Sequence, residues 1–530
     1  MKAPLYWALF SALIVCTPRI QAQVDSVALR YGGTITAEDL MRHLRVIASD
    51  EFEGRETGMR GQKLAAEYLR NAFMEMGIPP LEKVGVKGME RGYFMPFVLD
   101  VDRPGGIRVR AGGRTYRFMD DLYYFSERLT RESKTRTITV VAGVQMTDSM
   151  FKDMVLQDHA LLWIDPGPQG PPSFERRKDD PDFFKRMTIV SGAASREGAA
   201  ALFILTGEYA EVKGRYIHQI TEPRMRLARA PGLETDRPSS PTSMQTIIAG
   251  PELGNALLEG AGVTWKKIQR RIRRGPYMST ANLLVEFLYS PLRSRVQSEN
   301  VLAFIPGRER PGELVVVTAH YDHIGMKDGE IYNGADDDGS GTVALLEMAE
   351  AFAKANSDGH GPLRSVLLMP VSGEEEGLLG SAYYAEHPVF PLDSTVADLN
   401  IDMIGRSDSV HASSSPYVYV IGSNRLSSEL HAINEEANRT YVGLELDYTF
   451  NAPDDPNRFY YRSDHYNFAK NGVPSIFYFS GVHSDYHGPH DEVERIRPDL
   501  LEQRARLVFY TAWALANRPR RIVQDIATDH

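Results

Sequence analysis

Cysteine is nearly absent from this chain of 530 residues, in which Cys16 is the only one. It directly follows a short apolar run, Leu5–Val15, near a positively charged amino terminus. This pattern is typical of an export signal, and small residues allow cleavage near Ala22 or Gln23. The processed chain would contain no cysteine, which excludes disulfide bonds and every thiolate mechanism.

Long apolar runs are also lacking. A transmembrane helix needs about 20 apolar residues, and neither residues 1–23 nor any later segment provides them. We therefore expect an exported protein, periplasmic or secreted, with a signal peptide at 1–23 and no transmembrane segment after it. A lipoprotein attached through Cys16 is the alternative. It is disfavoured because residues 13–15 are not the small residues that usually precede a lipidated cysteine.

Dense blocks of positive charge are missing as well. The net charge of −10 is modest and spread along the chain, so a nucleic-acid backbone is not the expected partner. The short basic run over residues 270–274 is interpreted as a solvated surface stretch. The content of apolar and charged residues is ordinary for a soluble globular protein, and the length is enough for two or three domains.

The character of the sequence changes twice along the chain. Residues 24–100 contain two helical patterns, and residues 101–275 contain short strand-like runs broken by proline, glycine and charged clusters, which predicts a β-rich insertion. From 276 to 518 strands alternate with helices. This rhythm predicts an α/β fold whose mostly parallel, mixed sheet is sandwiched by helices. Residues 519–530 are interpreted as a tail.

The individual elements follow from apolar periodicity and from the residues that begin and end helices. Thr36 is the expected N-cap of the first helix, and Gly77 ends a second helix that begins near Gly61. Strands are predicted at 160–164, 301–304, 314–318, 365–370, 396–403, 417–421 and 475–479. Helices are predicted at 341–355, 427–437, 463–470 and 498–516.

Residues that can carry chemistry gather in five segments, and four of these follow the carboxyl ends of predicted strands. In open α/β sheets that edge is where ligands bind. The segments are Thr318–His323, Asn333–Gly341, Ser372–Gly377, Asn400–Ile404 and His483–Asp491. Taken singly, each has a structural alternative: a histidine after a strand is usually only hydrogen-bonded, and an acidic triplet can lie on a solvated helix.

Two of the segments are difficult to explain without a cation. Asp336, Asp337 and Asp338 are consecutive and repel one another unless positive charge neutralises them. Capping the following helix would need only one acid. Asp402 interrupts an apolar strand, where a carboxylate must be paired or bound to a metal.

The candidate donors follow one another along the chain in the order His, Asp, Glu, Asp, His. Mixed nitrogen and oxygen ligands suit zinc, and five protein ligands with a shared carboxylate suit a pair of metals. The first of them, His320, follows a run of valines. Asp322, two residues later, is placed to accept the second imidazole N–H of His320 and fix its orientation.

These motifs resemble those of the zinc-dependent aminopeptidase family, whose relatives include glutamate carboxypeptidase and, more distantly, glutaminyl cyclase. The resemblance is strong over residues 300–515 and moderate over 36–97. It rests on Ala319–Gly325, Gly334–Gly341, Glu374–Gly377 and Asn400–Met403, with Asp50–Arg55 matching a stretch common in exported members. It implies a zinc exopeptidase fold in which residues 24–100 and 276–518 form the peptidase domain.

The resemblance also implies a ligand set. Two Zn²⁺ ions would be bridged by Asp337. One site would be completed by His320 and Asp402, and the other by Glu375 and His487. In relatives the bridging aspartate is followed by a cis peptide bond, so one is expected after Asp337.

Three catalytic roles follow from the same resemblance. Glu374 matches the general base that takes a proton from the attacking water and then protonates the leaving amine. Tyr486 is similar to a tyrosine that donates a hydrogen bond to the tetrahedral oxyanion, and Asp322 would orient His320. The segment Arg462–His465 resembles one that lines the substrate pocket.

The inserted region, 101–275, is similar to a protease-associated domain. This resemblance rests on Trp163–Asp165 and Gly198–Ile204. In relatives such insertions shape access to the active site, so we expect the same of this one.

We therefore expect a dizinc exopeptidase that removes N-terminal residues from peptides. A carboxypeptidase or dipeptidase on the same fold is the first alternative, but a carboxypeptidase needs a basic cluster for the terminal carboxylate, and only Arg462 lies near the motifs. A glutaminyl cyclase works with one zinc and lacks the double ligand set. A non-catalytic binding protein of this fold would lose ligands or the base, whereas this chain retains all five ligands and Glu374.

Overall fold

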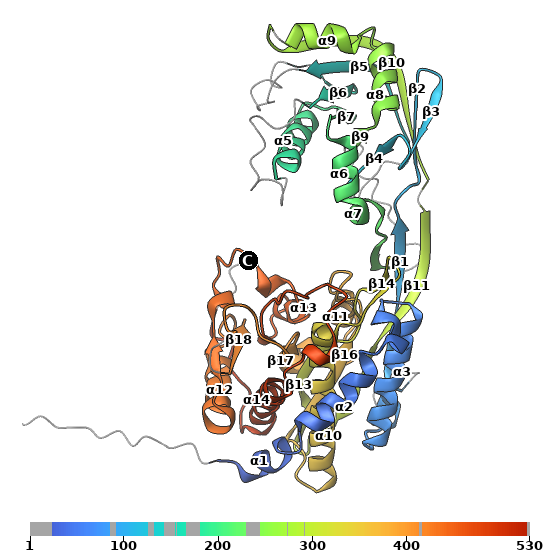
Figure 1. Cartoon of the computed structure of the whole chain (residues 1–530). Coiled ribbons are helices and arrows are strands. Elements are labelled where there is room, and N and C mark those ends of the chain that lie inside the picture. The colour runs from blue at the N-terminus through green and yellow to red at the C-terminus, as the bar shows by residue number, and fades with distance from the viewer. Residues whose placement is uncertain are drawn as a thin grey trace, which may run out of the picture. The chain divides into compact units, whose positions relative to one another are not determined.

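The described residues divide into two units. The first contains the chain up to Pro96 and from Ser298 onward, and the second contains Phe97–Gln297 (Figure 1). The computed structural model describes residues 24–84, 92–125, 132–142, 154, 156–165, 181–228, 244–272, 274–290, 292–412 and 416–526. The expected signal peptide at 1–23 lies outside the described residues.

A seven-stranded sheet forms the centre of the first unit. Its strands lie in the order β12-β16-β13-β17-β20-β18-β19. Their bounds are Ala303–Ile305 (β12), Arg364–Val371 (β16), Arg310–His320 (β13), Thr395–Ile401 (β17), Ser475–Phe479 (β20), Tyr417–Ile421 (β18) and Glu445–Asp447 (β19). The four strands from β16 to β20 are parallel, whereas β12 and β18 are antiparallel to their neighbours β16 and β20. The predicted mostly parallel, mixed sheet is confirmed.

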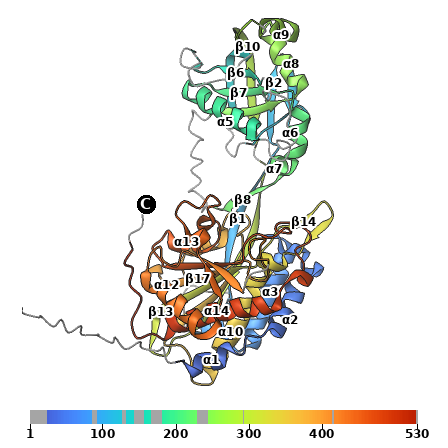
Figure 2. The same ribbon diagram turned by 60° about the vertical axis from the view of Figure 1, so that its left-hand side comes forward.

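Helices cover both faces of this sheet, as predicted. One face packs against α10 and α14 and, beyond them, α1, α2, α3 and α12, whereas α11 and α13 lie on the other (Figures 1 and 2). The helices are α1 Ser26–Gly32, α2 Ala37–Ile47, α3 Arg60–Glu75, α10 Gly341–Ser357, α11 Leu379–Glu386, α12 Ser428–Ala437, α13 His465–Ala469 and α14 Pro498–Asn517.

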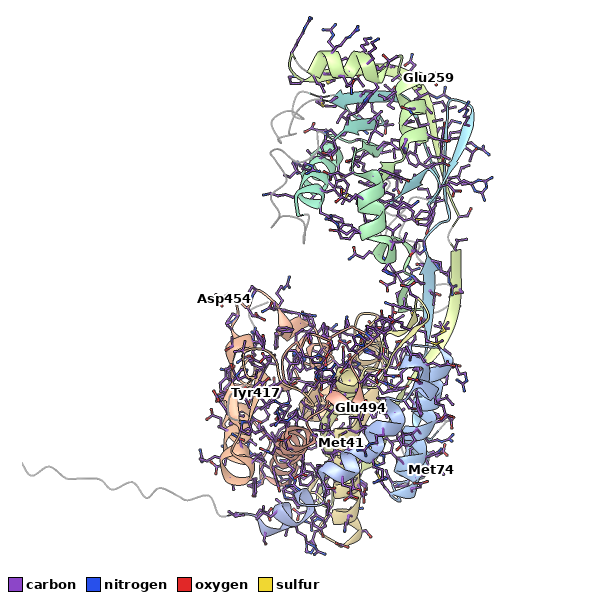
Figure 3. All side chains as sticks on the ribbon, in the orientation of Figure 1. Met41, Met74, Glu259, Tyr417, Asp454 and Glu494 are labelled. Carbon is purple, nitrogen blue, oxygen red and sulfur yellow. The ribbon has the colours of Figure 1, made fainter. Side chains whose placement is uncertain are left out.

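The amino-terminal helices begin and end where their sequence signals lie. The Thr36 hydroxyl accepts the Asp39 N–H at 3.2 Å, so it caps α2 as expected. After α3, Gly77 adopts a positive φ of 75°, which glycine tolerates without strain. Met41 of α2 is buried against the core, whereas Met74 of α3 is exposed (Figure 3).

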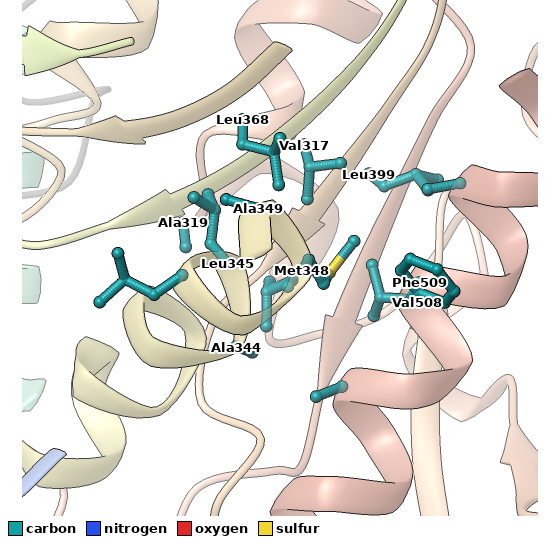
Figure 4. Packing of buried hydrophobic residues seen from close by; sticks show 14 of the residues in the cluster. Val317, Ala319, Ala344, Leu345, Met348, Ala349, Leu368, Leu399, Val508 and Phe509 are labelled. Atoms are coloured by element: carbon teal, nitrogen blue, oxygen red, sulfur yellow. The ribbon is translucent and has the colours of Figure 1, made fainter. Parts of the chain in front are cut away.

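Alternate residues of the central strands enter separate cores. In β13, Val315, Val317 and Ala319 pack toward α10 and α14, whereas Leu314 and Val316 pack toward α11 and α13. Figure 4 shows the first of these contacts, in which side chains of α10, of α14 and of the strands meet in one cluster. Because apolar side chains on both faces are buried, these strands read as continuous apolar runs in the sequence.

The second unit has an eight-stranded sheet in the order β3-β2-β10-β5-β6-β7-β9-β4. Its strands are Ile107–Ala111 (β2), Arg114–Arg117 (β3), Leu122–Tyr123 (β4), Glu132–Ala142 (β5), Ala160–Ile164 (β6), Ala201–Leu205 (β7), Gln245–Ala249 (β9) and Tyr277–Tyr289 (β10). Its helices are Pro181–Arg196 (α5), Tyr209–Arg215 (α6), Ile217–Thr221 (α7), Pro251–Gly260 (α8) and Trp265–Ile272 (α9). The strands β5, β6, β7 and β9 are parallel, so this unit contains more α/β character than the predicted β-rich insertion.

The boundary of the second unit differs from the expected one at residue 275. β10 begins at Tyr277 and pairs with both β5 and β2, which carries the unit to Gln297. The composition does not change there, because β10 has the same alternating pattern as the strand that follows it. A separate three-stranded sheet, β11-β1-β8, joins Leu292–Val301, Phe94–Arg103 and Arg224–Leu227.

Among the described residues, none of the helices combines the length and the apolar character needed to cross a bilayer.

A buried acid lies on α10, away from the ends of the central strands. Glu347 is 2% exposed, and its Oε1 lies 3.4 Å from Nε2 of His43, whose Nδ1 lies 2.6 Å from the Tyr68 hydroxyl. Burial raises the pKa of Glu347 to about 8, with the charges of Glu350 and Asp39 acting in the same direction. Burial also lowers the pKa of His43 to about 4, so both groups are neutral near pH 6 to 7.

Replacing Glu347 with glutamine is expected to make the protein more stable at high pH. The folded state holds a proton on Glu347 up to about pH 8, whereas the unfolded chain releases it near the ordinary value of 4.5, so the wild-type protein loses stability as pH rises through this window. Relative to pH 5, the variant should gain on the order of 3 kcal/mol over wild type at pH 9 in urea unfolding. Glu386→Gln, an exposed acid that does not contribute to the shift of Glu347, is the control, and an equal pH slope in wild type and Glu347→Gln would refute this expectation.

Candidate metal centre

The parallel strands of the first unit end level with one another. In the register of the sheet, His320 at the end of β13 pairs with Val371 at the end of β16, and Ala319 pairs with Ile401 at the end of β17. Asp402 directly follows β17, and the loop that follows β20 carries His487. The sheet therefore gathers side chains from distant segments at its carboxyl edge.

Asp337 lies at the centre of this edge. Its Oδ1 is 3.3 Å from Nε2 of His320, and its Oδ2 is 3.2 Å from Nε2 of His487. The peptide bond between Asp337 and Asp338 is cis, as the resemblance implies. A single carboxylate thus presents one oxygen to each of two histidines.

Each histidine also faces a second carboxylate. Nε2 of His320 lies 3.6 Å from Oδ1 of Asp402, and Nε2 of His487 lies 3.2 Å from Oε2 of Glu375. Two ligand atoms bound about 2.1 Å from one tetrahedral ion lie roughly 3.4 Å apart. The separations around Asp337 therefore have the size expected for two donor sets that share one carboxylate.

Neighbouring histidines lower the pKa values of two of these carboxyl groups. Burial raises the pKa of Asp337, but the neighbouring imidazoles of His320 and His487 outweigh it and hold that pKa well below the usual range. For Glu375, burial and Asp337 raise the pKa, yet His323 and His487 bring it to about 2. Several buried donor atoms also lack a hydrogen-bond partner, among them Nε2 of His320 and Oδ2 of Asp337. Buried polar atoms are rarely left so, and a bound cation would satisfy them.

Glu374 lies beside these sets but belongs to neither. Its Oε2 is 3.9 Å from Nε2 of His320. Burial raises its pKa well above the ordinary value; His320 opposes this, and Asp402 and Glu375 add to it. The pKa of Glu374 is thus shifted in the opposite direction to those of Asp337 and Glu375, and strongly perturbed carboxyl groups are typical of functional sites.

Asp322 differs from its expected contact. Its carboxylate Oδ1 lies 3.9 Å from Nδ1 of His320, and the nearer acceptor for that ring nitrogen is the main-chain oxygen of Asp322 at 3.1 Å. The carboxylate is instead occupied by the Thr57 hydroxyl at 2.5 Å and the Glu374 N–H at 3.3 Å. Asp322 thus contacts His320 through its backbone and holds the main chain of Glu374 through its side chain.

A pocket opens directly beside the donor sets. Its polar side is formed by Asp337, Glu374, Asp402 and His487, and it contains about 340 Å³ of empty space including its open mouth. The rest of its lining is Met403, Phe459, Arg462, Phe477, Phe479, Val482 and Tyr486. The Tyr486 ring stacks on that of His487 with centroids 3.9 Å apart, and Arg462 donates to the Tyr486 hydroxyl at 3.3 Å.

Three supporting residues are not identifiable as such from the sequence. Arg55 is fully buried and donates to the main-chain oxygens of Tyr321, Asn333 and Gly334, at 2.6 to 2.9 Å. Asp491 accepts the N–H groups of Asp336 and Asp337 at 3.0 Å each. The Ser463 hydroxyl donates to Oδ2 of Asp402 at 2.7 Å. Arg55 lies in the Asp50–Arg55 motif, but its contacts with remote backbone oxygens have no periodic signal.

His323 is a further residue at this edge, and no separate role for it follows from the sequence. It is buried, and its Nδ1 lies 2.8 Å from Oε1 of Glu375, the oxygen opposite the one that faces His487. By proximity alone the donors can also be grouped as His320, Asp338 and Asp402, and as His323, Asp337 and Glu375. Oδ1 of Asp338 is already engaged by two backbone N–H groups at 2.9 Å, which favours Asp337 over Asp338 as the shared donor.

Replacing His487 and His323 singly should distinguish these groupings. His487→Ala is expected to lose one of two bound metals, because it removes a direct donor. His323→Ala should keep both and bind one of them about 10- to 100-fold more weakly, because it removes a residue that orients Glu375. Titration with zinc against a chromophoric chelator measures both outcomes, with the exposed His490→Ala as the matched control. The opposite result, with stoichiometry reduced only by His323→Ala, would make His323 the ligand.

The combination of an α/β sheet edge, two histidine–carboxylate sets joined by one aspartate and an adjacent buried glutamate defines a metallohydrolase-type centre. Residues 300–512 match the model of peptidase family M28. Over these residues, which make up less than half of the chain, the sequence is similar to a family of peptidases. The nitrogen and carboxylate donors at this sheet edge fit zinc, and the two sets around Asp337 fit two ions.

Curated relatives agree with this assignment. The chain is 30% identical over 264 residues to a probable zinc metalloprotease of Pyrenophora tritici-repentis, covering 42% of this chain and 53% of the relative. It is 28% identical over 240 residues to the aminopeptidase YwaD of Bacillus subtilis, covering 43% of this chain and 48% of the relative. The chain thus spans about half the length of the curated relatives it matches.

A solved structure extends the likeness in fold beyond the family region. The aminopeptidase from Aneurinibacillus sp. strain AM-1 matches with a TM-score of 0.53 and 17% identity, over 94% of this chain and 98% of that chain. At this identity the likeness concerns the fold alone, and it supports the zinc exopeptidase fold expected from the sequence.

Proposed function

We propose that this chain is an exported dizinc aminopeptidase. The observation that carries the proposal is the position of Asp337, whose two oxygens face two separate histidine–carboxylate sets, with Glu374 buried beside both and part of neither. His320 and Asp402 would hold one zinc, and Glu375 and His487 the other. The apolar stretch before residue 23 supports export, and the inserted region is proposed to be protease-associated-like.

Glu374 would move the protons of the reaction. Bound zinc would lower the pKa of water and polarise the scissile carbonyl. Glu374 would take the proton of the attacking water and deliver it to the nitrogen of the leaving amine, so that the same carboxylate serves both steps. Its position beside both donor sets and outside them favours this role.

Tyr486 would stabilise the oxyanion that forms from the scissile carbonyl. Burial raises the pKa of its hydroxyl, and the charges of Asp337 and Glu375 raise it further, so the hydroxyl stays protonated and can donate. Arg462 donates to the same hydroxyl and is thereby drawn toward the pocket. Asp322 would act through its hold on Glu374 and His320.

The lining of the pocket favours an aminopeptidase that prefers apolar N-terminal residues. Met403, Phe459, Phe477, Phe479 and Val482 offer apolar surface for one side chain. The acids beside the metals suit a free α-amino group. Arg462 is the only basic residue other than histidine in this lining, and a carboxypeptidase would need a larger basic cluster for the terminal carboxylate.

A panel of peptides with free, acetylated and C-amidated ends tests this function. We expect free and C-amidated peptides that begin with Leu or Phe to be cleaved at the first bond, and N-acetylated ones to resist. A leading Glu should lower kcat/KM by about 10- to 100-fold relative to Leu, because its carboxylate would be desolvated in the apolar pocket. Cleavage of acetylated peptides as fast as free ones would rule out the aminopeptidase, and dependence on a free C-terminus would favour the carboxypeptidase.

A further inference from the structure

The strongest concentration of positive charge in the chain lies at α9 of the second unit. Six basic residues fall within residues 266–274, and no acid occurs between Glu259 and Glu286, although the whole chain carries a net charge of −10. Figure 3 labels Glu259, the last acid before this stretch, at the end of α8. Five of the six lie among the described residues, and all five are exposed: Lys266, Lys267, Arg270, Arg271 and Arg274.

These five side chains are free of partners within the part of the chain that the structure describes. None of them forms an ion pair or a side-chain hydrogen bond there, whereas exposed arginines elsewhere in the unit are often paired, as Arg226 is with Asp102 at 2.8 Å. The sequence predicts a solvated surface for this run, and it is exposed as expected. Unneutralised charges of one sign at this density attract an anionic partner.

Exposed apolar side chains occur in the same stretch of the sequence. Trp265 is 46% exposed, Ile272 36% and Met278 58%, while Ile268 is buried and attaches the helix to the unit. We define the α9 surface as these three apolar residues together with the five basic ones. A tryptophan and aliphatic side chains flanked by lysine and arginine are the composition of helices that lie in the plane of a membrane interface.

We propose that the α9 surface docks on an anionic lipid bilayer. α9 has eight residues, too few to span a membrane, so it would lie along the headgroups with its charges on anionic lipids and Trp265 at the level of the interface. A nucleic acid fits less well, because Ile272 and Met278 gain from contact with acyl chains and gain nothing from a phosphate backbone. This inference does not depend on the metal centre.

Binding of the full chain to lipid vesicles tests the proposal. We expect cosedimentation with phosphatidylcholine vesicles that contain about 30 mol% phosphatidylglycerol, and at least tenfold weaker binding to phosphatidylcholine alone. A basic side chain near an anionic surface strengthens binding roughly fivefold, so removing four charges should weaken it at least tenfold. The test variant combines Lys266→Gln, Lys267→Gln, Arg270→Gln and Arg271→Gln.

A matched variant removes the same number of charges from another exposed basic group of the second unit. It combines Arg108→Gln, Arg110→Gln, Arg114→Gln and Arg117→Gln, on β2 and β3, and should bind within about threefold of wild type. The emission of Trp265 should shift to shorter wavelength on anionic vesicles. The shift should be absent in Trp265→Phe, because Trp163 and Trp513, the two other tryptophans among the described residues, are buried.

Three results would overturn the proposal. The first is equal binding to neutral and anionic vesicles, and the second is equal loss in the two quadruple variants. The third is binding to DNA or heparin through the α9 surface with no binding to anionic vesicles, which would assign this surface to a soluble polyanion.

Discussion

Replacing Glu374 with glutamine is expected to lower kcat by about 10³- to 10⁴-fold while the protein keeps both metals. Glutamine preserves the shape of the side chain and removes its ability to accept and return a proton. Because Glu374 belongs to neither donor set, the metal content should stay at the wild-type value. Steady-state kinetics with a leucine amide and elemental analysis of the same preparation measure both quantities.

The adjacent acid provides the control for this experiment. Glu376→Gln removes one carboxylate from the same turn, and its turnover should stay within about tenfold of wild type. A Glu374→Gln protein with two metals and near wild-type turnover would contradict the proposed base. A Glu374→Gln protein that has lost metal would place Glu374 among the ligands, and the donor sets would need to be redrawn.

The second large effect is expected at the shared carboxylate. Asp337→Asn leaves one oxygen in place and replaces the other with an amide, which cannot serve a second cation. We expect metal content to fall from two per chain to one or fewer, and turnover to fall on the order of 10⁴-fold, because several kcal/mol of charge stabilisation disappear. The circular dichroism spectrum of the variant should match that of wild type, which excludes misfolding. Zinc titration of the same variant then measures the loss of metal.

The two aspartates beside Asp337, Asp336 and Asp338, have structural contacts, because their side chains accept hydrogen bonds from backbone N–H groups. Oδ1 of Asp336 accepts the Gly405 N–H at 2.6 Å, and Oδ1 of Asp338 accepts the Met403 and Gly341 N–H groups at 2.9 Å. Asp336→Asn should therefore reduce stability more than metal content. If Asp336→Asn and Asp337→Asn lost metal equally, the bridging role of Asp337 would be wrong.

Much of the fold could be predicted because its strands are buried on both faces. Runs such as the valines before His320 are both apolar and β-branched, so they predict parallel strands, and polar residues just after them predict a ligand edge. This pattern alone assigns four of the five donor segments to the edge of the sheet. The choice of Asp337 within its acidic triplet comes from the resemblance, since charge repulsion alone does not distinguish three adjacent aspartates.

What the sequence could not provide are contacts made between loops. The carboxylate of Asp322 is held by Thr57 and by the backbone of Glu374, which no local spacing indicates. His323 faces Glu375 across two strand ends, and Asp491 holds backbone groups more than 150 positions away. Such contacts depend on how several loops pack at one edge, and short-range patterns carry no information about that.

The second unit is the least predictable part for a related reason. The strand β10 alternates exposed and buried residues much as β11 does, so nothing in the composition separates the two units near residue 297. The helix α5 buries Phe183, Val190 and Ala194 on one side. This helical spacing of apolar residues is difficult to recognise in the sequence because charged residues lie nearby.

Metal stoichiometry is the most direct test of the proposed centre. We predict that the purified chain, loaded with zinc and dialysed, contains two zinc ions per chain by elemental analysis, and that His487→Ala contains one. A wild-type protein that binds one zinc or none under these conditions would contradict the shared-aspartate centre on which the proposed function rests.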